Sequence, residues 1–358
     1  MSTETIWKAR GRLSDGREIV YFDESPDTGR AAVADTRGLP EPAWAPPEFR
    51  TDPFTGENVV IAAQRQGRTY HPPADECPLD PSGPGRATEI PASSYDVVVF
   101  ENRFPSLRNP HGRCEVMCFT SVHDSSFASL TPQRVRTVMA AWIDRTVTLG
   151  NLPEVQQVYC FENRGEEIGV TLHHPHGQIY AFPFVTPRTQ QMIAQARADP
   201  DLFDRLVQAE LDGQQRIIAG NEHWVAFVPH AARWPFEVRI FPIARVPDLS
   251  VLSEKQREAF GPVYLKVLRA LDLLFGMPLP YIAAWHQAPG RDEAARKVFA
   301  AHLQVFSVRR AADKLKYLAG TESGMGVWIN DIVPEEAARR LREAAGATVL
   351  SEKRGSAE

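Results

Sequence analysis

Residues 171–180 read Thr171-Leu172-His173-His174-Pro175-His176-Gly177-Gln178-Ile179-Tyr180, so three of the ten histidines of the chain stand within four positions. Proline fixes its own φ and moves the preceding residue toward extended backbone, which predicts a strand-like segment. Alternate residues of an extended chain share a face, so we expect His174, His176 and Gln178 on one side. Gly177 carries no side chain, and we expect it to let a bulky ligand approach the backbone. We interpret this cluster as a functional site.

The segments around this motif occur twice in the same order. Glu115-Val116-Met117-Cys118-Phe119 recurs 122 residues later as Glu237-Val238-Arg239-Ile240-Phe241, and His174 matches His302 at a spacing of 128. Between these matches, each copy carries an N-cap signal, Thr131 or Ser253, followed by apolar residues at helical intervals. A mainly helical stretch, residues 188–219, separates the copies. The order predicts an α+β protein made of two repeats, each with the element order strand, strand, helix, strand, strand.

Composition limits the classes of protein to which the chain can belong. At roughly 150 residues per domain, 358 residues favour two domains or one duplicated domain. The formal net charge of −5 gives no field that favours nucleic acid or an anionic membrane. The longest apolar runs are too short to span a bilayer, and residues 1–5 lack the pattern of a signal peptide, so we expect a cytoplasmic protein. Four cysteines cannot form a disulfide scaffold here and are expected as thiols or metal ligands.

From about residue 50 to about residue 345, the sequence resembles the galactose-1-phosphate uridylyltransferase family, a branch of the histidine triad superfamily. The sharpest element is residues 174–178, His-Pro-His-Gly-Gln, because the transferase branch has glutamine where the hydrolases have a third histidine. The resemblance implies two histidine-triad-like repeats, each an antiparallel half-barrel sheet with flanking helices. Four regions follow: a lead-in segment (1–45), a catalytic, nucleotide-binding repeat (46–205), a hexose-phosphate repeat (206–345) and a frayed tail (346–358).

The resemblance also implies a reaction of galactose metabolism. In the family, the histidine that matches His176 attacks the α-phosphorus of UDP-glucose and carries UMP covalently, and galactose 1-phosphate then collects the uridylyl group. A neutral imidazole is nucleophilic at neutral pH, which agrees with this role. The Gln178 amide can donate a hydrogen bond to a phosphoryl oxygen but cannot act as an acid, which favours transfer over hydrolysis.

Further site residues carry over by position. In the first repeat they are the candidates for nucleotide and phosphate contacts, namely Arg65, Arg68, Asn102, Asn163, Gly169 and Thr171. In the second repeat, Lys316 and Glu322 match the hexose-phosphate loop of the family. Arg103 stands where the family usually has an aspartate, which leaves the ribose contact at that position open. The resemblance further implies a homodimer whose active site is completed across the interface.

One zinc site is also implied by the resemblance. Its ligands are Cys77, Asp80, His123 and His174, with Asp80 in the place of the second cysteine that many family members have. Thiolate, carboxylate and two imidazoles make an acceptable tetrahedral set. Some relatives hold a second metal, for which His286 and His302 match two ligands while Gln304 replaces a third. We expect this second site to be absent.

Two other functions remain open from the sequence. The first is a nucleotide-sugar or dinucleoside polyphosphate phosphorylase of the ADP-glucose type, which would use inorganic phosphate as acceptor. The second is a noncatalytic nucleotide-binding protein. His176 and Gln178 argue against the second, because binding alone needs no nucleophile.

Overall fold

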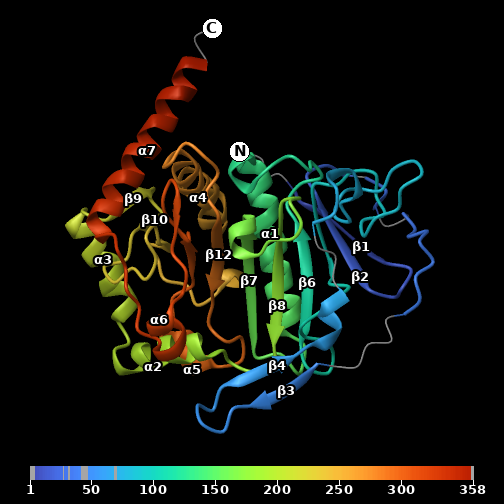
Figure 1. Ribbon diagram of the computed structural model, residues 1–358, viewed down its shortest axis with the longest axis horizontal. Coiled ribbons are helices and arrows are strands. Elements are labelled where there is room, and N and C mark those ends of the chain that lie inside the picture. Colours follow the sequence, from blue (N-terminus) through green and yellow to red (C-terminus); the bar gives the residue numbers. More distant parts are fainter. Residues whose placement is uncertain (1–4, 27, 31–32, 42–46, 68–70, 356–358) are drawn as a thin grey trace.

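The computed structural model describes residues 5–355 except 27, 31–32, 42–46 and 68–70. One antiparallel sheet of eleven strands forms its centre, in the order β1-β2-β5-β6-β8-β7-β12-β13-β11-β10-β9 (Figure 1). The strands of this sheet are β1 (Trp7–Arg12), β2 (Glu18–Asp23), β5 (Val97–Glu101), β6 (Arg113–Cys118), β7 (Gln157–Arg164), β8 (His176–Phe182), β9 (Ile217–Gly220), β10 (Trp224–Phe227), β11 (Val238–Pro242), β12 (Tyr281–His286) and β13 (His302–Phe306).

The remaining elements are helices and two small hairpins. The helices are α1 (Pro132–Gly150), α2 (Pro187–Ala198), α3 (Leu202–Gly213), α4 (Glu254–Leu273), α5 (Glu293–Val298), α6 (Gly320–Met325) and α7 (Pro334–Gly355). The hairpins pair β3 (Glu48–Thr51) with β4 (Asn58–Ile61) and β14 (Arg309–Ala311) with β15 (Lys314–Leu315). In the described part of the chain, no helix combines the length and apolar composition that a membrane span requires.

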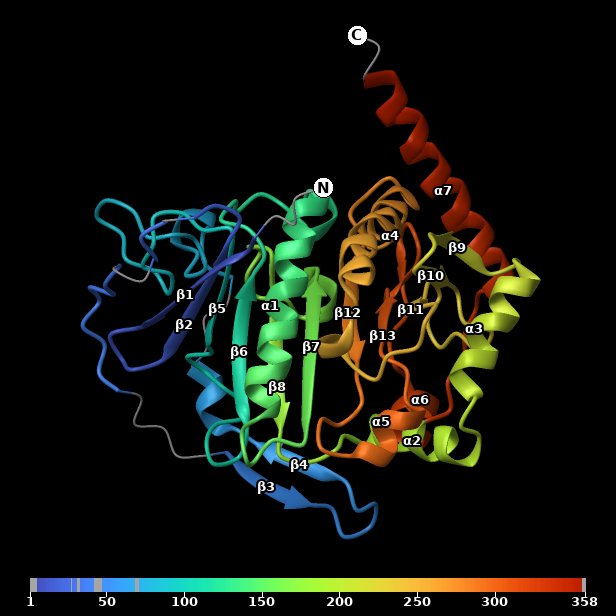
Figure 2. The same ribbon diagram turned by 180° about the vertical axis from the view of Figure 1, so that it is seen from behind.

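The strand order confirms the duplicated α+β fold. Outward from the centre, β7-β8-β6-β5-β2 in one half mirrors β12-β13-β11-β10-β9 in the other, and the halves join where β7 pairs with β12. Figure 2 shows α1 and α4 side by side on the same side of the sheet, which we call the helix face. A continuous apolar core lies between these helices and the strands. The two equivalent helices therefore close one core over both repeats.

The predicted N-caps of these helices are confirmed. The Thr131 hydroxyl accepts a hydrogen bond from the Arg134 backbone N–H, and Ser253 forms a reciprocal capping box with Gln256. The stretch 188–219 is helical as predicted up to Gly213, but β9 begins at Ile217. The predicted division of the chain between residues 205 and 206 lies inside α3 and stays a prediction, as does the frayed tail.

The sequence match between Glu115 and Glu237 is wrong by one residue. Met117 and Val238 both face the helices, and they pair with equivalent positions of β8 and β13. Because side chains alternate along a strand, a shift of one residue reverses the face. Glu115 lies on the helix face, where the buried Arg145 of α1 donates to its two oxygens at 2.7 and 2.8 Å, whereas Glu237 lies on the opposite face.

A layer of loops covers the opposite face of the first repeat. A second apolar core joins this layer to the sheet, and it includes Leu79 and Tyr95 from the loops and Phe100, Val116 and Cys118 from the strands. The segment that carries Cys77 and Asp80 is thereby fixed against β5 and β6, next to the start of β8. We call this side of the sheet the site face.

Candidate active site

His176 and Gln178 lie side by side on the site face of β8. The strand begins at His176, so the predicted extended strand is confirmed from that residue onward but not for Thr171–Pro175. Ile179 and Ala181 alternate with them and belong to the core on the helix face. His176 and Gln178 both line a pocket of about 160 Å³. The backbone alternation thus delivers the two predicted catalytic side chains to one cavity.

A hydrogen bond to the backbone sets the tautomer of His176. Its Nδ1 lies 2.7 Å from the backbone carbonyl oxygen of His174. A carbonyl only accepts, so Nδ1 carries the proton and donates it, which leaves the lone pair on Nε2. Burial lowers the pKa of His176 to about 4 and keeps the ring neutral. The side chain is therefore a neutral imidazole with one free nucleophilic nitrogen.

Gly177 serves packing beneath the strand and not ligand approach, which corrects the expectation from the sequence. Its missing side chain would point toward the helix face, where a Cβ would lie 2.8 Å from both Phe119 Cζ and the Phe161 backbone oxygen. The glycine therefore lets β8 lie close to the core while its neighbours face the pocket.

Tyr180 orients the Gln178 amide. The Tyr180 hydroxyl donates to Gln178 Oε1 at 3.3 Å and also lies 3.3 Å from the Ser106 hydroxyl. With its oxygen engaged, Gln178 has its NH₂ group free to donate to a ligand. The sequence pattern gave no role to Tyr180, although its position two residues after Gln178 in a strand places it on the same face.

Three of the predicted nucleotide contacts line the same pocket. They are Arg65, Asn102 and Thr171, and the apolar walls come from Pro78, Leu79, Phe100, Phe104, Val116 and Leu172. Arg65 donates from Nη1 to the Phe104 carbonyl at 3.1 Å, and Asn102 Oδ1 accepts from the Phe104 backbone N–H at 2.8 Å. Arg68 lies outside the described residues. The pocket thus combines apolar walls with amide, hydroxyl and guanidinium groups.

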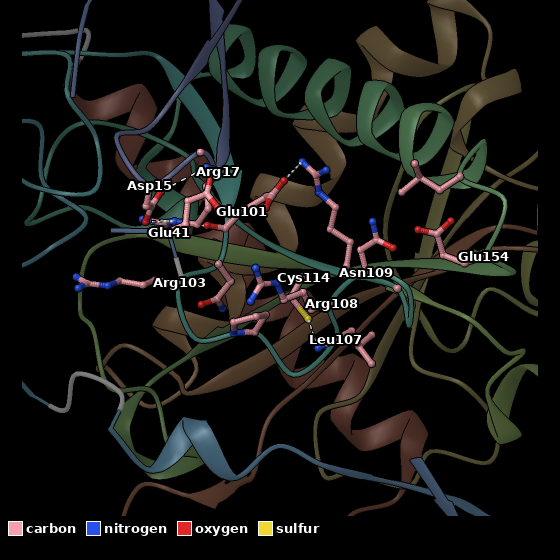
Figure 3. Close-up of a pocket in the computed structure, with 16 residues that line it drawn as sticks. Asp15, Arg17, Glu41, Glu101, Arg103, Leu107, Arg108, Asn109, Cys114 and Glu154 are labelled. Carbon is pink, nitrogen blue, oxygen red and sulfur yellow. Dashed lines mark hydrogen bonds and ion pairs between the residues drawn. The ribbon is translucent and has the colours of Figure 1, made fainter. Parts of the chain in front are cut away.

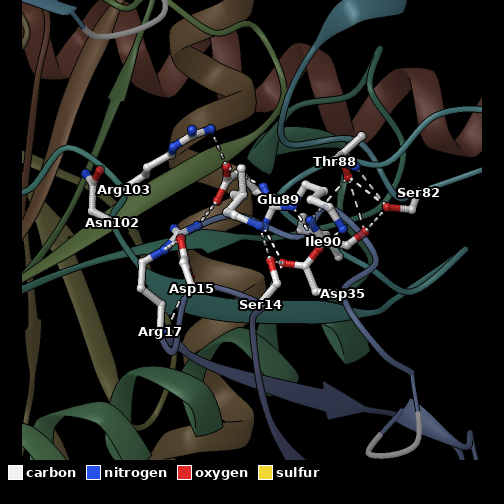
Figure 4. Close-up of polar contacts among 12 residues, drawn as sticks. Ser14, Asp15, Arg17, Asp35, Ser82, Thr88, Glu89, Ile90, Asn102 and Arg103 are labelled. Atoms are coloured by element: carbon white, nitrogen blue, oxygen red, sulfur yellow. Dashed lines mark hydrogen bonds and ion pairs between the residues drawn. The ribbon is translucent and has the colours of Figure 1, made fainter. Parts of the chain in front are cut away.

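Glu89 is a pocket residue that the sequence did not reveal. It accepts from Arg17 and Arg37 at 2.6 Å each, and Arg103 lies 3.6 Å away (Figure 4). A carboxylate is therefore present near Arg103, where the family usually has an aspartate. Residues around Glu89 form no recognisable motif, so only the folded loop layer brings it to the pocket.

A second cavity, of about 360 Å³, shares Asn102 and Arg103 with this pocket (Figure 3). Both signs of charge line it, and many of the charged groups neutralise each other, as Arg113 does with Glu101 at 2.9 Å. We assign it no ligand.

The other predicted contacts lie elsewhere. Asn163 is in β7, opposite Ile282 of β12, and Gly169 ends a short 3₁₀ helix with φ of 82°; neither lines the pocket. Lys316 and Glu322 are buried against each other, with Nζ and Oε1 3.1 Å apart. Their α6 region lies beside the second repeat, away from β8 (Figure 1). One chain therefore does not bring them to His176.

The four predicted metal ligands come together. The ligand atoms of Cys77, Asp80, His123 and His174 all lie within 4.8 Å of one another. Asp80 Oδ1 is 2.8 Å from His123 Nδ1 and 2.9 Å from His174 Nδ1. Residues from three separate segments thus form one compact group.

The hydrogen bonds of His174 show that this group fits a cation. Its Nε2 lies 2.8 Å from the Thr120 carbonyl and 2.7 Å from the Tyr95 hydroxyl, which itself donates to the Leu79 carbonyl. Nε2 must therefore carry the proton, so the Nδ1 lone pair of the neutral ring faces the Asp80 carboxylate. Two lone pairs at this separation need a positive charge between them, and the sulfur, oxygen and nitrogen donors suit a divalent metal.

The second repeat has a different arrangement at the equivalent place. His286 Nε2 lies 2.9 Å from Gln304 Oε1, and Gln304 Nε2 donates to Glu237 at 2.8 Å. The ring of His302 stacks on His286 with centroids 4.9 Å apart. The Gln304 amide thus contacts both His286 and Glu237. The absence of a second metal at this place stays a prediction.

Comparisons with known proteins agree with this geometry. Family models for the N-terminal and C-terminal domains of galactose-1-phosphate uridyl transferase match residues 107–186 and 188–354. The chain is 51% identical to the galactose-1-phosphate uridylyltransferase of Streptomyces lividans, covering 94% of this chain and 98% of the relative. It is 36% identical to the Thermotoga maritima enzyme of that name, covering 83% and 98%.

A solved structure described as a uridylyltransferase superposes with a TM-score of 0.74 at 28% identity, covering 84% of this chain and 99% of that one. Matches of this extent in sequence and in structure span both repeats. The chain therefore belongs to the galactose-1-phosphate uridylyltransferase family.

Proposed function

We propose that this protein is a UDP-glucose–hexose-1-phosphate uridylyltransferase, which exchanges UMP between UDP-glucose and galactose 1-phosphate through a covalent uridylyl-His176. The observation that carries the proposal is the His176 ring, whose Nδ1 is bound to the His174 carbonyl while the ring lines a pocket beside the Gln178 amide. Family membership and the identity of the relatives support the substrates.

In the first half of the reaction, His176 Nε2 attacks the α-phosphorus of UDP-glucose. The N–P bond forms as the P–O bond to glucose 1-phosphate breaks, and the sugar phosphate leaves with the electron pair as a stable anion. The Gln178 NH₂ group donates to a non-bridging oxygen on which charge develops. Arg65, Asn102 and Thr171 hold the nucleotide in the pocket, with the uracil against the apolar walls.

In the second half, a phosphate oxygen of galactose 1-phosphate attacks the same phosphorus, and the N–P bond breaks to return neutral His176. The attacking phosphate is already an anion, so no general base is needed. Activation of water would need such a base, and an amide cannot serve as one. The Gln178 side chain therefore favours transfer to a sugar phosphate over hydrolysis.

The test follows the nucleotide onto the protein. Incubation with UDP-glucose labelled in the α-phosphate, followed by a quench in base, is expected to leave acid-labile label on the wild type and on His230→Ala, an exposed histidine control. His176→Ala should carry none. Release of that label as UDP-galactose should require galactose 1-phosphate.

Other outcomes would point to other functions. Label from ADP-glucose alone, discharged by inorganic phosphate, would identify a phosphorylase instead. Nucleotide binding without label from either donor would identify a binding protein. Label that persists in His176→Ala would remove His176 as the nucleophile.

We further propose that Cys77, Asp80, His123 and His174 hold a structural Zn²⁺, which ties the loop layer to the start of β8. His174 then contributes its ring to the metal and its carbonyl to His176, so the metal site supports the position of the nucleophile. Metal analysis should find about one zinc ion per chain less in Cys77→Ser than in the wild type. Chelation should lower Tm in the wild type, and an unchanged Tm and activity in fully zinc-free protein would contradict this role.

We also propose a homodimer in which Lys316 and Glu322 act in the partner's active site. Their distance from the pocket within one chain supports this arrangement. The chain from Tyr317 to Val333, which includes Glu322, also exposes large apolar side chains, which are typical of an interface. They are Tyr317 (74% exposed), Leu318, Met325 (80%), Val327, Ile329 and Val333.

A further inference from the structure

A second group of metal-binding side chains lies outside the catalytic residues and outside the cysteine-containing group. His71, Glu166 and His173 bring their ligand atoms within 4.8 Å of one another. Glu166 Oε1 lies 3.1 Å from His173 Nε2 and 4.0 Å from His71 Nδ1. The carboxylate therefore sits between two imidazoles that come from separate segments of the chain.

The backbone holds these three residues in place. The His71 N–H donates to the Thr171 carbonyl at 3.1 Å, although His71 has an unusual positive φ of 44°. Glu166 starts a 3₁₀ turn after Gly165, where a Cβ would lie 2.6 Å from Pro280 Cβ, so this loop packs closely against the start of β12. His173 directly precedes the buried His174. These contacts among the described residues thus help to position His71 and Glu166 beside His173.

The Glu166 carboxylate has ion-pair contacts with the two histidines and not with a lysine or arginine among the described residues. The adjacent Glu167 pairs with Arg309 at 2.6 Å, whereas the ion-pair contacts of Glu166 within the described residues are the two imidazoles alone. An unprotonated imidazole offers a lone pair and no positive charge. The three side chains thus offer two imidazole nitrogens and a carboxylate oxygen close enough together to bind one divalent cation.

We propose that His71, Glu166 and His173 bind a divalent first-row transition-metal ion of the Zn²⁺, Co²⁺ and Ni²⁺ class. Two imidazoles and one carboxylate suit such ions and leave coordination positions open to water or to a phosphate oxygen. The backbone of Thr171, a pocket residue, is bonded to His71, so the ion lies close to the pocket. The site does not depend on the proposed reaction.

Metal stoichiometry tests the proposal. Tag-free wild type, the double variant His71→Ala/His173→Ala and the control Glu167→Gln are dialysed against Co²⁺ and analysed for bound metal. The wild type and the control should hold one ion per chain more than the double variant. The cobalt–thiolate absorption of the Cys77 site should be equal in all three, because the second site contains no sulfur. Equal stoichiometry in the wild type and the double variant would overturn the proposal.

A second measurement uses the wild-type protein. It tests metal binding at His71, Glu166 and His173 even if the double variant misfolds and loses the cobalt–thiolate absorption of the Cys77 site. Diethyl pyrocarbonate modification is mapped by mass spectrometry with and without Ni²⁺. The ion should protect His71 and His173 but not the exposed His230. Equal modification of His71 and His173 in both conditions would show that no metal binds there.

Discussion

Two atoms of the first repeat exclude a side chain at position 177, since Phe119 Cζ and the Phe161 backbone oxygen both lie 2.8 Å from where a Cβ would stand. We predict that Gly177→Ala lowers the free energy of unfolding by about 1–3 kcal/mol, because core atoms must shift. The shift would move His176 on the same strand, so nucleotide labelling should fall as well. Urea titration measures the first effect. Gly150→Ala, which meets nothing within 4 Å, should be as stable as the wild type, and an equally stable Gly177→Ala would contradict the packing argument.

Glu162 makes stability depend on pH. It is buried on the helix face, where Tyr281 donates to Oε1 at 3.0 Å, and burial raises its pKa from 4.5 to about 8. The folded state thus binds this proton more tightly than the unfolded state, so the stabilisation is complete below pH 4.5 and is lost as the pH rises to 8. We predict that Glu162→Gln, which keeps an acceptor for Tyr281, flattens this fall and is more stable than the wild type at pH 8. Parallel curves of Tm against pH for the two proteins would refute this assignment.

For single residues, the sequence predicted which side chains belong to the site better than it predicted where each of them points. The motif pointed to His176 and Gln178 because alternation in a strand is a local property. The direction of Gly177 and the pocket position of Glu89 depend on what the fold places beneath or across from them, and no local pattern contains that information. The catalytic roles of His176 and Gln178 stay predictions, as do the roles assigned to the other site residues.

The two equivalent helices, α1 and α4, begin at caps that the sequence made visible. Thr131 satisfies one backbone N–H, whereas Ser253 and Gln256 satisfy two reciprocally. We predict that Thr131→Ala costs about 1 kcal/mol of unfolding free energy and that Ser253→Ala costs at least as much. Denaturant titration with Thr131→Ser as the conservative control checks the first value. No loss in either alanine variant would mean that packing alone fixes these helix ends.

The strands were harder to align than the helices. N-caps are chemical signals tied to one residue, so the matched caps of the two repeats were found at their true positions. Matches between strands depend on an apolar pattern that does not fix a single position. Because Glu115 and Glu237 are both glutamate, the sequence aligned them although the two strands are offset by one residue. The error of one residue assigned the side chains of β11 to the wrong faces of the sheet. The register of a strand can therefore be determined only from its pairing with the neighbouring strands.

For the whole molecule, the duplication could be predicted, because the same order of strands and helices can be recognised in both halves even where single residues differ. The joining of the halves through β7 and β12 into one sheet was not, since that pairing connects segments more than a hundred residues apart. In this arrangement Lys316 and Glu322 lie beside the second repeat, whereas His176 lies in the first. This separation is the reason for the proposal that a second copy of the chain brings Lys316 and Glu322 to His176.

A mixed dimer separates this arrangement from one in which each chain works alone. His176→Ala and Lys316→Met/Glu322→Gln are co-expressed with different affinity tags, and the double change removes both charges of the buried pair together. Each parent homodimer should be inactive or nearly so. In the purified hybrid, one site combines an intact His176 with the intact loop of its partner, so we predict about half of the wild-type activity. If Lys316 and Glu322 served their own chain, both sites of the hybrid would carry a defect and no activity would return.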